Sequence, residues 1–108
     1  MPDIQSTGPI ITGTAAALGS LYVEDFSVLV FILTMSATTE TVSMTVSVDG
    51  TNYSTTTVRP LDLLTGALFA SNTIKAGVFK LDVKGIKSVK FTKSSTSETA
   101  TIYTGLGQ

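Results

Sequence analysis

The sequence predicts an all-β protein, a single small antiparallel β-sandwich of the jelly-roll or immunoglobulin-like kind, with an extended N-terminal arm. Short apolar or alternating runs recur about every eight to twelve residues, with turn residues between them. β-branched Val, Ile and Thr are common in these runs, and such residues favour strands. No segment has the 3.6-residue period of an amphipathic helix. At 108 residues the chain fits one domain.

The expected elements follow in order along the chain. Residues 1–9 contain Pro2, Gly8 and Pro9 and few apolar anchors, so we expect an arm that becomes ordered only on a neighbouring molecule. Residues 10–108 form the sandwich. A turn or single helical turn is expected over 15–20 and an irregular connection over 61–66. The strands are expected at residues 10–14, 20–24, 27–35, 41–48, 53–58, 67–70, 78–83, 88–93 and 99–104.

The pair Asp49-Gly50 predicts a structural turn. It ends the run TVSMTVSV, in which apolar and polar residues alternate as in a half-buried strand. Asp49 can accept a hydrogen bond from the backbone two residues on, and Gly50 adopts positive φ without steric cost. The alternative is a cation site built from Asp49 and Asn52. A calcium loop needs about six oxygen ligands and this stretch offers two, so we expect no metal here.

The segment SVLVFILTM, residues 27–35, is apolar on both faces, whereas a sandwich strand should show one face to water. Three explanations remain open: the chain's own connections cover the second face, another subunit covers it, or the segment is not a strand. One face must join the core and the other can dock. Because the polar Ser27 stands at the head of its register, the docking face is expected to be Leu29, Phe31, Leu33 and Met35.

Charge is sparse and unevenly placed. Charged residues make up 14% of the chain, against about 25% in an ordinary domain, and the net charge is −1. Six of the seven basic residues lie between Lys75 and Lys93, with only Asp82 among them. This segment is either a solvated sheet face or a contact for an acidic partner surface. In the second case Lys80 and Lys84, together with Ile4 of the arm, are candidate contact residues.

The sequence contains none of the residue combinations that are typical of catalysis or of cofactor binding. There is no histidine, no cysteine and no glycine-rich phosphate or dinucleotide motif. We therefore expect no enzyme and no cofactor. The longest apolar run is about ten residues, half of a membrane span, so no membrane partner is expected. No arginine lies among the clustered lysines, which makes nucleic acid a poor candidate.

The stretch from residue 41 to 106 resembles small β-sandwich modules of tailed bacteriophage virions. The pieces that carry the resemblance are a strand ending in S-x-D-G at residues 47–50, Thr65-Gly66, the run GVFKLDVKG at residues 77–85, SVKF at residues 88–91, and the Thr-rich closing strand at residues 99–103. Such modules are head decoration (cement or staple) proteins, or parts of tail, fibre and adaptor proteins. A lone module without a coiled coil or repeat favours decoration.

The resemblance implies a structural role and no catalytic residues. It implies a homo-oligomer, dimer or trimer, that binds the major capsid protein or other virion proteins. The N-terminus MPDIQSTGP lacks the basic and apolar regions of a signal peptide. The resemblance further implies synthesis in the host bacterial cytoplasm and a place on the outer surface of the capsid. A carbohydrate-binding module is the alternative from another class, although the chain has no tryptophan and only three tyrosines to stack on sugars.

Overall fold

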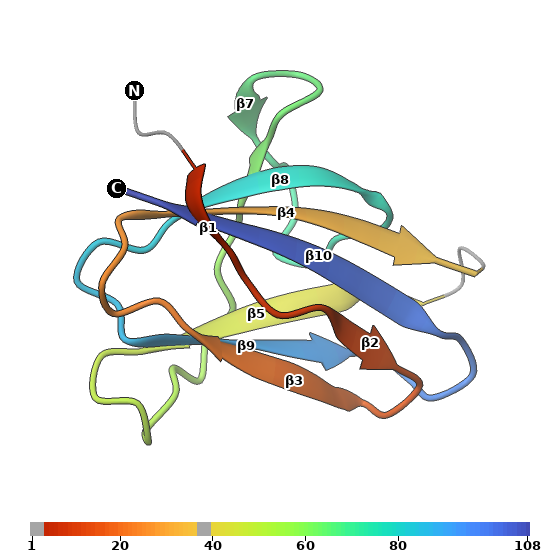
Figure 1. The fold of residues 1–108 in the computed structure, drawn as a ribbon. Coiled ribbons are helices and arrows are strands. Elements are labelled where there is room, and N and C mark those ends of the chain that lie inside the picture. Colours follow the sequence, from red (N-terminus) through yellow and green to blue (C-terminus); the bar gives the residue numbers. More distant parts are fainter. Residues whose placement is uncertain (1–3, 37–39) are drawn as a thin grey trace.

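The computed structural model describes residues 4–36 and 40–108, and within them every regular element is a strand (Figure 1). No helix in the described part of the chain could span a membrane. The ten strands are β1 (Ile4–Thr7), β2 (Ile11–Gly13), β3 (Ala17–Tyr22), β4 (Val28–Met35), β5 (Val42–Ser47), β6 (Leu61–Asp62), β7 (Ala67–Leu68), β8 (Gly77–Asp82), β9 (Ser88–Lys93) and β10 (Ala100–Gly107).

The strands form two antiparallel sheets packed face to face, which confirms the predicted β-sandwich. The larger sheet has seven strands in the order β1-β10-β4-β8-β6-β7, and β2 pairs with the other end of β10. The smaller sheet has the order β3-β9-β5. In Figure 1 the larger sheet lies above the smaller one, and the β6–β7 hairpin projects beyond its edge.

The core lies between the sheets and is centred on three phenylalanines. Phe31 of β4 is opposite Phe79 of β8 in the register, and the ring centroids are 5.5 Å apart. Phe91 of β9 meets Phe31 from the other sheet at 5.4 Å, in an edge-on arrangement that aromatic rings favour. The aliphatic side chains around them come from both sheets, so the core joins the two layers into one unit.

The expected arm is corrected for residues 4–7. These residues form β1, which pairs antiparallel with β10 of the same chain, for example Thr7 opposite Gly105. The Gly8 N–H continues the contact by donating to the Thr104 carbonyl at 3.1 Å. This stretch is therefore ordered on its own chain and needs no neighbour, because the edge of β10 offers it backbone partners. Residues 1–3 lie outside the described residues.

Two further expectations about elements were wrong. Residues 17–20, expected in a turn, belong to β3, where β-sheet pairing with β9 overrides the small-residue composition. Residues 53–58, expected as a strand, form no ladder. They follow the edge of β5 through single bonds, from the Ser54 N–H to the Val46 carbonyl and from the Val58 N–H to the Met44 carbonyl. These bonds cover part of an edge that a free strand would leave exposed.

Candidate functional site

Strand β4 carries two apolar faces, as predicted, but the assignment of the faces was wrong. Leu29, Phe31 and Leu33 are buried in the core, and Phe31 is only 1% exposed. They cannot form a docking surface on the folded chain, because their register points at Phe79 and at the smaller sheet. Met35 is half-buried and packs against the same core.

The outer register of β4 is the one that reaches the surface. Val28 at its start is buried, Val30 is half-buried, and Ile32 is 44% exposed. Thr34 at its end is also exposed. Thr34 was the sequence signal for the outward face. Ser27 gave the wrong assignment of the two faces because it lies before the strand and not in it. Its N–H donates to the Gly107 carbonyl at 2.9 Å.

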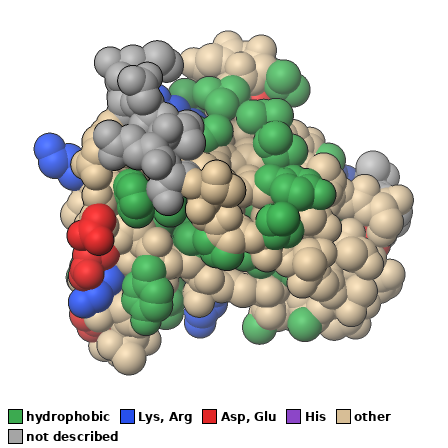
Figure 2. Space-filling model, in the orientation of Figure 1, with side chains coloured by type: hydrophobic (Ala, Val, Ile, Leu, Met, Phe, Trp, Pro, Cys, Tyr) green, Lys and Arg blue, Asp and Glu red, His purple; other side chains and the backbone are tan. Residues whose placement is uncertain are grey.

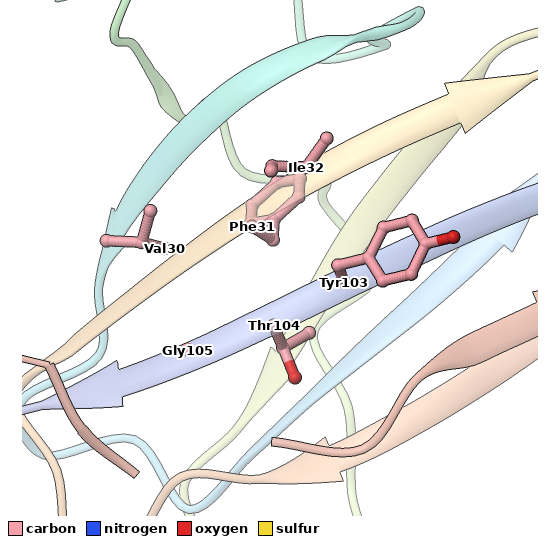
Figure 3. Close-up of a pocket in the computed structure, with 6 residues that line it drawn as sticks. All are labelled: Val30, Phe31, Ile32, Tyr103, Thr104 and Gly105. Carbon is pink, nitrogen blue, oxygen red and sulfur yellow. The ribbon is translucent and has the colours of Figure 1, made fainter. Parts of the chain in front are cut away.

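A shallow apolar hollow lies on this outer face (Figure 3). It measures about 210 Å³, and Ile32 and Tyr103 border it from the neighbouring strands β4 and β10. Gly105, opposite Val30 in the register, contributes no side chain and so leaves the space open. The remaining lining atoms come from Phe31 and Thr104. No acidic, basic or other charged side chain lines the hollow.

The lysine-rich segment does not form one surface. Lys80 lies on the outer face of β8, and Lys84 is exposed in the turn after it. Lys87 pairs with Glu24 at 3.1 Å, and the ammonium of Lys90, in β9 of the smaller sheet, lies 4.4 Å from the ring centroid of Tyr53. These are exposed or half-exposed contacts, which contribute little to stability. The roles of Lys80, Lys84 and Ile4 in partner binding stay predictions; the backbone of Ile4 lies in β1 opposite Gly107.

A buried polar cluster at one end of the sandwich escaped the sequence analysis. The Lys93 ammonium lies 3.3 Å from Glu40 Oε1, and both side chains are almost fully buried. Lys93 also donates to the carbonyls of Thr14, at 3.0 Å, and of Glu98. Through these two hydrogen bonds and the ion pair, Lys93 joins the β2–β3, β9–β10 and β4–β5 connections.

The carboxyl groups of the same cluster are held by hydrogen bonds. Ser97 donates to Glu40 Oε2 at 2.9 Å, and the Glu40 N–H donates to Glu98 Oε1 at 3.1 Å. Burial raises the pKa of Glu40, but the hydrogen bonds from Ser97 and Lys93 and the Lys93 charge outweigh it, so the pKa lies below its ordinary value. The ionised pair is therefore a structural clamp.

Asp49 and Gly50 lie in a sharp bend after β5, which hydrogen bonds to the Asp49 carboxylate hold in place. Gly50 has φ = +87°, in the region that glycine alone adopts freely. Asp49 Oδ1 accepts from the N–H groups of Thr51, at 2.9 Å, and Asn52, at 2.8 Å, while Oδ2 accepts from the Asn52 side chain. Bonds from Asn52 first, then from Thr51 and Ser47, hold the pKa of Asp49 well below its usual value. The chain itself engages both carboxylate oxygens. Among the described residues no group of three acids, histidines or cysteines could hold a metal.

Comparison with known proteins identifies the fold. No family model and no curated protein matches the sequence. The SPBc2 prophage-derived protein YomS superposes with a TM-score of 0.75 at 15% identity, over 100% of this chain and 96% of that one. The PBSX exported protein XepA superposes with a TM-score of 0.72 at 15% identity.

YomS is described as a prophage-derived protein and XepA as an exported protein. The match covers 98% of this chain but 40% of XepA, so the chain spans less than half of that protein. At 15% identity the likeness shows a shared fold and does not transfer a residue or a role. The described residues thus form a β-sandwich of a kind found both as nearly a whole protein, in YomS, and as part of a longer one, in XepA.

Proposed function

We propose that this chain is a structural protein of a bacteriophage virion and that it acts as a head decoration, or cement, protein. The observation that carries the proposal is the end-to-end likeness to a prophage-derived protein, in which the same sandwich makes up almost the whole chain. A small sandwich of this kind, without a coiled coil, suits a module that docks on a shell.

The proposed mechanism uses binding energy alone. A copy that binds the expanded capsid lattice and not the unexpanded one stabilises the expanded state by mass action, by RT ln(1 + [L]/Kd) for each site. Weak contacts repeated over one particle add through multivalency. The absence of histidine and cysteine and the engagement of Asp49 and Glu40 within the fold agree with a role that needs no reaction.

An add-back experiment tests the proposal. Three samples are heated: wild-type particles of the encoding phage, particles produced with this gene deleted, and deleted particles mixed with the purified chain. DNA release is followed by dye fluorescence. We expect the deleted particles to release DNA at a lower temperature and the added chain to restore the original temperature. Release temperatures that are identical for all three samples contradict a cement role.

A second candidate rests on the other structural match, whose protein is described as exported. On this reading the chain is encoded by a phage but works away from the virion. Fractionation separates the two candidates. After lysis, a cement protein sediments with the particles in a density gradient, whereas an exported protein is found in the culture medium before lysis begins.

A further inference from the structure

The outer face of the larger sheet carries two adjacent rows of mostly apolar side chains. Backbone pairing fixes both rows, since directly paired residues of neighbouring strands point the same way. The first row is Tyr103, Ile32 and Val78, on β10, β4 and β8. The second row is Gly105, Val30, Lys80, Leu61 and Leu68, from β10 across to β7.

The apolar surface continues onto the β6–β7 hairpin. Leu64 at its tip is 79% exposed, and Leu63 and Leu68 are also exposed. The tip is held in one shape, because the Leu64 N–H donates to Asp62 Oδ1 at 2.9 Å and the Gly66 N–H donates to the Asp62 carbonyl at 2.8 Å. Figure 2 shows hydrophobic side chains gathered from this hairpin down over the larger sheet. An exposed and largely apolar surface of this kind marks an interaction site.

The charges on this face indicate what kind of partner fits. The outward positions of β4 and β10 carry no charged residue, and those of β8 carry one base, Lys80, and one acid, Asp82. The hairpin adds one more acid, Asp62, whose carboxylate accepts from the Leu64 N–H. A strongly acidic or basic partner gains little from a surface with so few charges, of both signs. A second copy of the chain brings the same apolar rows and the same balance of charge, as an interface between identical patches requires.

The size of the face agrees with this partner. The six strands in the path of the larger sheet contain 30 residues, those of the hairpin strands β6 and β7 included. Each residue rises by about 3.4 Å and neighbouring strands lie about 4.8 Å apart, so the projected area is about 500 Å². A stable interface buries about 800 Å² of accessible surface per partner. Protruding side chains make the accessible area of the face larger than its projected area, and the exposed Leu63 and Leu64 of the hairpin loop add to it.

We propose that the outer face of the larger sheet, including the β6–β7 hairpin, is the interface of a homodimer related by a twofold axis that lies between the two facing sheets. The dimer covers the second apolar face of β4 with the same face of another copy. Its existence does not depend on the proposed cement function, and a virion protein of this kind would dock as a dimer.

The oligomeric state of the purified full chain tests the proposal. Sedimentation velocity over a wide range of concentrations should give a monomer–dimer equilibrium. Ile32→Lys and Leu64→Lys should each raise the dimer dissociation constant by about 100-fold or more, since each places two like charges in an apolar interface. Val48→Lys is the matched control, because Val48 is also an exposed apolar residue, 72% exposed, but follows β5 of the other sheet. It should stay dimeric.

Cross-linking gives a second readout that does not rely on tolerance of a charge. The chain has no cysteine, so Ile32→Cys carries a single thiol, which lies within the proposed interface. A short bis-maleimide should link Ile32→Cys into a dimer and leave Val48→Cys largely monomeric. A wild-type chain that is monomeric, or that forms a ring of more than two copies, overturns the proposal. So does a dimer that survives both lysine substitutions, with Leu64→Lys deciding if Ile32→Lys fails to fold.

Discussion

Replacing Phe31 by alanine tests the assignment of the two faces of β4 when it is compared with the same change at the next residue. Phe31 is 1% exposed, and its ring contacts Phe79 and Phe91 at centroid distances of 5.5 and 5.4 Å. Truncating a buried phenylalanine costs about 3–5 kcal/mol, including the cavity left behind. For a domain of this size that lowers the melting temperature by roughly 12–20 °C.

Ile32→Ala is the matched variant, because it changes the neighbouring residue on the same strand. Its side chain is 44% exposed, so about half of the burial is absent already, and the expected cost is about 1–2 kcal/mol. Urea unfolding followed by circular dichroism gives both values. The protein concentration must keep the chain monomeric, since Ile32 also lies in the proposed interface. If Ile32→Ala proves as costly as Phe31→Ala, the register derived from the structure is wrong.

Three further predictions concern stability. Gly50→Val should lower the free energy of unfolding by about 1–2 kcal/mol or more, because a β-branched side chain is strained at φ = +87°, whereas Gly50→Asn should cost less; equal melting temperatures for Gly50→Val and the parent would contradict this turn. Lys93→Met should lower the unfolding free energy by about 3–5 kcal/mol in the same urea assay, and wild-type stability in this variant would show that the clamp is not needed. Acid should destabilise the fold: Glu40 and Asp49 have folded-state pKa values below their ordinary 4.5 and 3.8, so the stability they contribute is complete above about pH 5 and is lost as the pH falls through the lowered values. Melting temperatures from pH 7 to pH 2 check the direction, and a melting temperature that rises on acidification would exclude it.

Local patterns were sufficient for most of the strands and for the sharp turn. The alternation at residues 41–48 and the Asp-Gly pair each determine the conformation of only a few neighbouring residues, so both can be recognised from the sequence. β7 lies inside the strand expected at residues 67–70, although it is shorter. β6 was expected to be part of an irregular connection, and it could not be predicted locally, because it has only two residues and exists through pairing with β7 and β8. Residues 53–58 have the composition of a strand but are not one, because only two backbone hydrogen bonds join them to the edge of β5.

The direction of β4 could not be read reliably from its own residues. A period of two residues separates two faces, but it does not say which face is inside when both are apolar. The answer depends on Phe79 and Phe91, which come from strands far along the chain. The polar residue inside the strand, Thr34, gave the correct direction, and the one before it, Ser27, did not.

The buried clamp had no local signal at all. Lys93 is the last member of a lysine-rich segment, and Glu40 stands in a threonine-rich connection, 53 positions earlier. Only the packing of three connections at one end of the sandwich brings them together, with the Thr14 and Glu98 carbonyls as further acceptors for the ammonium. From the sequence alone, a charged residue that will be exposed cannot be distinguished from one that will be buried in a cluster, because the difference depends on the topology.

The copy number of this chain in purified particles tests the central claim most directly. Particles of the encoding phage are banded in a density gradient, and the chain is quantified by mass spectrometry with isotope-labelled peptides, relative to the major capsid protein. A cement protein should be present in hundreds of copies per particle, at a fixed ratio to the capsid subunits, as its repeated binding to the lattice requires. A chain that is absent from the particles, or present in only a few copies, would contradict the account.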